Sequence, residues 1–295
     1  MSEVRKVGVL GCGLMGGGIA QVCATAGFET VVREAAQEPL DRGMAGINRS
    51  LDGALRRERI TAADREAIGA RLHPTTNLED LAECDIVIEA VTEDLALKQQ
   101  VWAEVDGIVQ PGSIFASNTS SLTIAAMASS TGRAESFVGL HFFNPAPAMR
   151  LVEVVRTVTT SDEAFEATMD FARALGKEPI AAKDHSGFIV NFLLIPYLLD
   201  AIRAVERGVA SVEDIDAGMR LGAAHPMGPL TLADFIGLDT LNSIAENLHA
   251  EHHEPRYGSP PLLRRMVLAG MYGRKSGLGF YDYSADPPEV ASLGI

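Results

Sequence analysis

The sequence of 295 residues predicts an α/β protein, in which a doubly wound, mostly parallel sheet is followed by an all-α C-terminal domain. Short apolar segments alternate with helical patterns as far as residue 183, which is typical of parallel strands joined by helices. A glycine-rich turn joins the first apolar segment to the first helical one. After residue 187 only helical patterns follow. We therefore expect two domains, 1–185 and 186–295, and the length also suggests two.

Composition and charge argue against several classes of protein. A hydrophobic content of 47% is ordinary for a folded protein with a sizeable core. The net charge of −14, without a basic tract, argues against nucleic-acid binding. The three cysteines suit neither a disulfide framework nor a zinc site, and we expect no metal. Because the sequence shows no signal peptide and no apolar stretch long enough to span a membrane, we expect a cytoplasmic protein.

The first elements are a strand, a glycine turn and a helix within residues 7–21, VGVLGCGLMGGGIAQ. Gly11 permits the tight turn, Gly13 lets a pyrophosphate approach the backbone, and Gly16 packs the helix against the strand. The free N–H groups at the start of the helix attract phosphate.

A second apolar strand, residues 29–32, leads to the acidic residue Glu34. An acid about 20 residues beyond the glycine turn binds the adenine ribose in dinucleotide-binding domains. A glycine turn with an unrelated surface glutamate is the alternative explanation. The complete series favours dinucleotide binding in a Rossmann-type domain.

Residues 39–59 are expected to form a long helix with a basic end, Arg56-Arg57-Glu58-Arg59. In an acidic chain this end is either a solvated helix face or a contact for a phosphate-bearing substrate. Thr61 then caps a further short helix, with Asp64 three residues on.

The next strands bring polar residues to the carboxyl edge of the sheet, where ligands bind in open α/β folds. Residues 85–91 form a buried-type strand that is followed by Glu93. Residues 113–117 form the next strand, followed by a run of small polar residues, 118–121. Capping of the following helix would by itself explain this run.

The strand at residues 137–140 ends at His141, and the strand at residues 151–155 has Glu153 in its middle. An acid among apolar residues needs a partner if it faces inward. A strand-end histidine held by such a carboxylate suits a general base, although a histidine at a strand end is by itself more often structural. Together with Ser120 on the preceding loop, this pair is the candidate for chemistry.

The C-terminal domain is predicted from its helical patterns, and in the first of them we expect a kink at Pro196. It has more apolar surface than one small domain needs, so we expect a homodimer through it. The expected helices are residues 188–207, 212–220, 231–235, 238–249 and 262–268.

Seven motifs follow one another along nearly the whole chain. They are GCGLMG (11–16), SNTSS (117–121), LHFFNP (140–145), LVEV (151–154), SGFIVN (186–191), HPMGP (225–229) and RKSGLGFY (274–281). In this order they resemble the 3-hydroxyacyl-CoA dehydrogenase family. The length resembles the short-chain members with a single activity, which act on substrates such as 3-hydroxybutyryl-CoA.

The resemblance implies a role for each matching residue. His141 would take the proton of the substrate's 3-hydroxyl as hydride leaves C3, and Glu153 would orient His141. Ser120 and Asn191 would hydrogen-bond the substrate oxygens. The other matches are cofactor contacts at Gly11, Gly13, Leu14, Met15, Gly16, Glu34, Glu93, Lys98, Ser120, Asn144 and Lys275, and coenzyme A contacts at Ser50 and Arg57.

Glu34 departs from the aspartate that many relatives carry, and Arg33 stands beside it. The Glu34 carboxylate should repel a 2′-phosphate and favour NAD, whereas Arg33 could pair with one. The sequence therefore favours NAD without excluding NADP.

The resemblance implies the reversible, NAD-dependent oxidation of a short-chain (3S)-3-hydroxyacyl-CoA to the 3-oxoacyl-CoA. Two alternatives stay open: a dehydrogenase of a free hydroxy acid or a sugar acid such as gulonate, and a dinucleotide-binding protein without catalysis. The motifs set neither the acyl chain length nor the physiological direction.

Overall fold

The computed structural model describes residues 4–294 and divides into two compact units, Met1–Phe188 and Ile189–Ile295. The division lies just after the boundary expected at residues 185 and 186.

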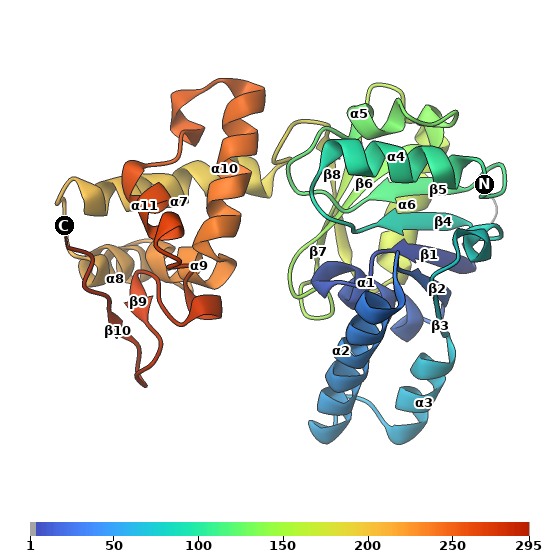
Figure 1. The fold of residues 1–295 in the computed structure, drawn as a ribbon, viewed down its shortest axis with the longest axis horizontal. Helices are drawn as coiled ribbons and strands as arrows, with labels where there is room; N and C mark the ends of the chain where they lie inside the picture. The colour runs from blue at the N-terminus through green and yellow to red at the C-terminus, as the bar shows by residue number, and fades with distance from the viewer. Residues whose placement is uncertain (1–3, 295) are drawn as a thin grey trace. The chain divides into compact units, whose positions relative to one another are not determined.

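The first unit is built on an eight-stranded sheet with the strand order β3-β2-β1-β4-β5-β6-β7-β8 (Figure 1). This order reverses between β1 and β4, which is the switch point at which open α/β sheets bind ligands. The strands are β1 (Lys6–Leu10), β2 (Glu29–Arg33), β3 (Leu72–Thr75), β4 (Ile86–Glu89), β5 (Ile114–Ser117), β6 (Phe137–Phe142), β7 (Leu151–Arg156) and β8 (Glu178–Lys183).

Helices cover both faces of this sheet, which confirms the predicted doubly wound fold. Apolar side chains from α1, α2, α3 and α6 form the core on one face, and those from α4 and α5 form the core on the other. The helices are α1 (Leu14–Thr25), α2 (Gln37–Arg56), α3 (Ala62–Ala70), α4 (Leu95–Asp106), α5 (Ile124–Ala128) and α6 (Asp162–Ala174).

The sheet is mostly parallel, as predicted, but its last two strands reverse direction. Strands β1 to β6 pair in parallel, β7 pairs antiparallel with β6, and β8 pairs in parallel with β7. A parallel crossover needs a dozen or more residues, and the connection at residues 143–150 is shorter. The expected alternation of strands and helices throughout this segment is therefore wrong at β7.

The second unit is helical, with its own apolar core. Its helices are α7 (Val190–Glu206), which contains Pro196, α8 (Val212–Gly222), α9 (Pro229–Ile236), α10 (Leu238–His252) and α11 (Pro261–Leu268). A small antiparallel ladder of β9 (Tyr281–Asp282) and β10 (Glu289–Val290) is an addition to the predicted all-α domain. Across residues 4–294, no helix combines the length and the apolar character needed to cross a membrane.

Candidate active site

The glycines of the turn between β1 and α1 differ in whether the fold requires a residue without a side chain. Gly11 has a φ of +93°, and a Cβ there would lie 2.7 Å from the carbonyl oxygen of Ala90. A Cβ on Gly16 would lie 2.0 Å from the carbonyl oxygen of Gly11. The Cβ position of Gly13 has no such neighbour within 4 Å. Gly11 and Gly16 therefore serve the fold, whereas the open side of Gly13 suits the approach of a phosphate.

Glu34 lies at the carboxyl end of β2 and folds back over this turn. Its carboxylate accepts the N–H of Cys12 at 2.9 Å and that of Ala35 at 2.8 Å. Burial, together with the Glu34 charge, raises the pKa of the Cys12 thiol to about 11. Cys12 is consequently a protonated, apolar part of the wall rather than a nucleophile.

A cavity of about 720 Å³ begins at the glycine turn and runs along α1 and α2. Residues predicted to contact the cofactor and residues predicted to contact coenzyme A both line this cavity. Arg59, which the sequence analysis noted only as part of a basic helix end, lines it as well. The predicted residues in its walls are Gly13, Leu14, Glu34, Ser50, Arg57 and Asn144.

The basic end of α2 supplies free positive charge to this cavity. Arg57 and Arg59 are both exposed, and within residues 4–294 neither forms an ion pair with a carboxylate. An unpaired guanidinium in an acidic protein suits a phosphate group.

His141 and Glu153 form a buried pair. They are directly opposite each other in the antiparallel register of β6 and β7, and His141 Nδ1 lies 2.7 Å from Glu153 Oε2. His141 is 6% exposed and Glu153 is fully buried. The carboxylate holds the Nδ1 side of the ring, so that Nε2 is the ring nitrogen left to exchange a proton. The rings of Phe143 and Phe188 pack against the imidazole, with centroids 4.5 and 5.7 Å away.

The loop after β5 carries Ser120 beside the end of β6. Asn118 accepts the N–H of Phe142 at 2.8 Å, which ties this loop to the strand of His141. The N–H of Ser120 donates to Glu93 Oε1 at 3.2 Å. Ser120 is only partly buried.

Lys98 is buried on α4, where its ammonium group lies 2.6 Å from Glu89 and 3.1 Å from Glu93. Ser117 also donates its hydroxyl to Glu89, at 2.7 Å. Neither Glu89 nor Ser117 was assigned a role from the sequence. An acid at the end of an apolar strand was the available signal for Glu89, by the same reasoning that selected Glu153.

The remaining predicted site residues are Met15, Asn191 and Lys275. Met15 is half-buried and packs on the core of the first unit. Asn191 lies nearly buried in the first turn of α7, in the second unit. Lys275, also in the second unit, pairs with Asp239 at 2.5 Å.

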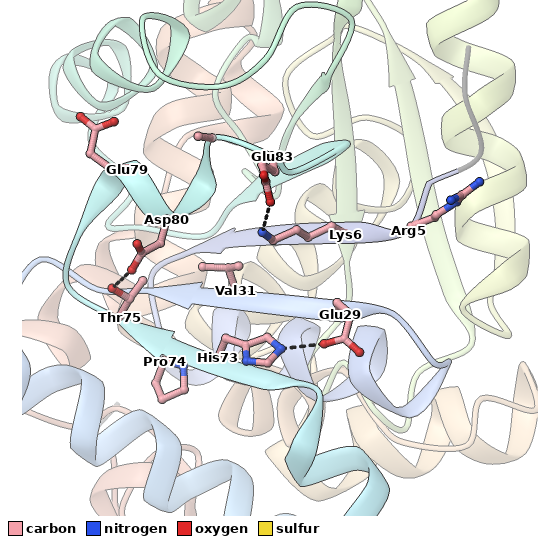
Figure 2. Close-up of a pocket in the computed structure, with 11 residues that line it drawn as sticks. Arg5, Lys6, Glu29, Val31, His73, Pro74, Thr75, Glu79, Asp80 and Glu83 are labelled. Atoms are coloured by element: carbon pink, nitrogen blue, oxygen red, sulfur yellow. Dashed lines mark hydrogen bonds and ion pairs between the residues drawn. The ribbon is translucent and has the colours of Figure 1, made fainter.

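Figure 2 shows a second hollow, of about 700 Å³, against the β1, β2 and β3 strands. None of the predicted site residues lines it. Two pairs of its titratable groups are in contact, His73 with Glu29 at 2.6 Å and Lys6 with Glu83 at 3.2 Å. Over the described range 4–294, no group of three or more His, Cys, Asp or Glu side chains is arranged to hold a metal ion.

Comparison with known proteins places these residues in a family context. Residues 6–185 match the model of the 3-hydroxyacyl-CoA dehydrogenase NAD-binding domain, and residues 187–283 match that of the 3-hydroxyacyl-CoA dehydrogenase C-terminal domain. The chain is 50% identical to a probable 3-hydroxybutyryl-CoA dehydrogenase of Deinococcus radiodurans, over 94% of this chain and 100% of the relative.

Two crystal structures are similar over 96% of this chain and the whole of theirs. One is FadB2 of M. tuberculosis, at 48% identity and a TM-score of 0.94. The other is the (S)-3-hydroxybutyryl-CoA dehydrogenase PaaH1 of Ralstonia eutropha, at 45% identity and a TM-score of 0.92.

Proposed function

The chain belongs to the 3-hydroxyacyl-CoA dehydrogenase family, and on that premise we propose that it oxidises a short-chain (3S)-3-hydroxyacyl-CoA, such as 3-hydroxybutyryl-CoA, reversibly to the 3-oxoacyl-CoA. It is an oxidoreductase whose cofactor is NAD. The observation that carries the proposal is the buried pair of His141 and Glu153 beside the loop of Ser120.

His141 acts as the general base in this proposal. Its Nε2 takes the proton of the 3-hydroxyl group during oxidation and returns it during reduction. Glu153, which is fully buried, holds Nδ1 and stabilises the imidazolium that proton transfer creates. Phe143 and Phe188 keep water from the ring, which strengthens the attraction between the two charges.

Ser120 and Asn191 bind the oxygen atoms of the substrate in this proposal. Ser120 stands on a loop that is held to the strand of His141 through Asn118, so the loop and the base are placed by the same strand end. The side-chain amide of Asn191 supplies both a donor and an acceptor.

Ser50 and Arg57 hold coenzyme A, with Arg59 as a neighbouring positive charge. All three line the cavity that begins at the glycine turn. Coenzyme A carries several phosphate charges, and the free guanidinium groups at this end of α2 offset the net charge of −14 of the chain locally.

The residues of the glycine turn fit NAD. Gly13 leaves the approach to the start of α1 open, and α1 has no side-chain cap that would occupy its first N–H groups. The Glu34 carboxylate at the end of β2 suits the ribose hydroxyls and disfavours a 2′-phosphate. When bound, NAD supplies the hydride acceptor.

The experiment follows NADH oxidation with acetoacetyl-CoA as substrate, with NADPH in a parallel reaction. We expect rapid loss of NADH absorbance and a much slower loss with NADPH. If folded protein that binds NADH is inactive with acetoacetyl-CoA but active with a free hydroxy or sugar acid, the gulonate-type alternative replaces the proposal. If the protein binds NADH but turns over none of these substrates, the non-catalytic alternative replaces the proposal.

We also propose a homodimer formed through the second unit. Large apolar side chains are exposed on its helices, including Leu193 on α7, at 63% exposure, and Leu268 on the last turn of α11, at 87%. Exposed apolar surface of this kind commonly marks a protein interface.

A further inference from the structure

Three oxygen atoms of the protein surround the Lys98 ammonium group. It lies 2.6 Å from Glu89 Oε1, 3.1 Å from Glu93 Oε2 and 3.5 Å from the carbonyl oxygen of Val91. An ammonium group has three N–H donors and no acceptor. Its side chain is 1% exposed, so in this structure it links groups of the protein to one another.

Glu89 anchors this link from the carboxyl end of β4. It is fully buried, and besides Lys98 it accepts the Ser117 hydroxyl at 2.7 Å and the Val91 N–H at 2.8 Å. A buried carboxylate with these partners holds Lys98 in one place.

Glu93 connects Lys98 to the loop of Ser120. One carboxylate oxygen faces Lys98, while the other accepts the Thr119 hydroxyl, the Ser120 N–H at 3.2 Å and the Ser121 hydroxyl at 3.4 Å. Lys98 carries one positive charge against two carboxylates. The remaining negative charge is therefore met by the donors of this loop, which it holds in place.

We propose that Glu89, Lys98 and Glu93 form a positioning relay that runs from β4 through α4 to the peptide N–H of Ser120. The relay fixes the Ser120 hydroxyl for substrate binding, and Glu89 and Lys98 act through it without touching substrate. This inference rests on the proposed function in that Ser120 is taken as a substrate contact.

The test compares three variants of the full chain. Glu89→Gln removes the anchor and leaves a buried ammonium group with half its counter-charge. Glu89→Gln/Lys98→Met removes both buried charges, which restores electrostatic balance but not the link to Glu93. The matched control, Asp106→Asn, breaks a different partly buried ion pair of the same unit, Asp106 with Arg133 at 2.5 Å.

Two readouts separate positioning from stability. Amide hydrogen exchange of residues 118–122 measures how firmly the loop is held without any substrate. Steady-state kinetics with acetoacetyl-CoA measures whether the loop supports turnover. We expect faster exchange in both Glu89 variants and kcat/KM lower by about 10²-fold, the loss that a misplacement of about 1 Å can cause. In Glu89→Gln, which keeps the predicted cofactor contacts Glu93 and Lys98, the dissociation constant of NADH should change far less. The control should lose thermal stability but keep kcat and the exchange rates.

The double variant is decisive, because its melting temperature should recover while kcat/KM stays low. Recovery of both, or wild-type exchange at residues 118–122 in either Glu89 variant, overturns the relay. If Glu89→Gln does not fold, the double variant carries the same comparison. If the wild-type protein does not reduce acetoacetyl-CoA, the proposed function fails, while hydrogen exchange still decides whether the relay holds the loop.

Discussion

In the proposed mechanism, the side chains of His141 and Glu153 act together through one contact, 2.7 Å between Nδ1 and Oε2. Both could be selected from the sequence, because an acid inside an apolar strand is unusual and needs a partner, and a histidine ends the preceding strand. Their direct opposition could not, since it depends on the register between β6 and β7. Glu89 was missed for a related reason. It precedes Lys98 by nine residues, and only the return of α4 over the sheet brings the two groups together.

We expect His141→Gln to reduce kcat by about 10²–10⁴-fold, because glutamine cannot accept the proton that a positioned base removes. Glu153→Gln should also reduce kcat, because the imidazolium loses its counter-charge. NADH titration and thermal melting serve as controls, and both should stay near wild type. A His141→Gln enzyme with nearly full turnover would remove His141 from the proposed mechanism.

At the scale of elements, the alternation of strands and helices predicted the doubly wound sheet and its glycine turn. It did not reveal the direction of β7, which depends on the absence of a helix from the connection at residues 143–150. A helix there would have allowed a parallel crossover, and without one the chain turns back into an antiparallel pair. Connection length was the physical signal, and the periodicity of the strands alone does not contain it.

The glycine turn gives a prediction that separates fold from binding. Gly13→Ala should leave the melting temperature nearly unchanged and weaken NADH binding, since its Cβ would point into open space beside the phosphate approach. Gly11→Ala should lower the free energy of unfolding by about 1–2 kcal/mol or more, because an L-residue is strained at positive φ. Its Cβ would also press on Ala90. Thermal melting and NADH titration measure both effects. Equal loss of stability in the two variants would contradict this division of roles.

The end of helix α2 offers a matched pair of arginines for testing coenzyme A binding, Arg56 in its last turn and Arg57 just after it. Arg57 lines the cavity, and its neighbour Arg56, although exposed, does not. Arg57→Ala should raise the KM for acetoacetyl-CoA about tenfold, the cost of one charge-assisted hydrogen bond, and leave NADH binding unchanged. Arg56→Ala should raise it much less, and added salt should narrow the difference. Similar KM values in both variants would show that the charge at this helix end acts without a specific contact.

At the scale of the whole molecule, length and pattern predicted two domains, and the chain divides into two compact units close to the expected boundary. The family motifs extend across both units. How the chain associates with a second copy is a separate question, because it depends on which apolar side chains stay exposed after folding. The sequence alone does not distinguish a buried leucine of α7 from an exposed one such as Leu193.

Leu193 provides the test of the proposed homodimer. Leu193→Asp places a charge on an apolar surface of the second unit and should shift the protein toward the monomer, as measured by light scattering on a sizing column. The control is Val158→Asp, which changes a 98% exposed apolar residue of the first unit and should leave the mass unchanged. A wild-type protein that is monomeric at all concentrations would refute the dimer.

The antiparallel pairing of β6 with β7 also sets how the base and its carboxylate come together during folding. Only 12 residues separate them in the chain, so closing this hairpin costs little loop entropy and needs no distant segment. The pair is thus a contact of low sequence separation within a sheet whose other pairings are longer-range. The same geometry limits length changes. An extra residue within β7 ahead of Glu153 would turn its side chain to the other face of the sheet, because side chains alternate along a strand.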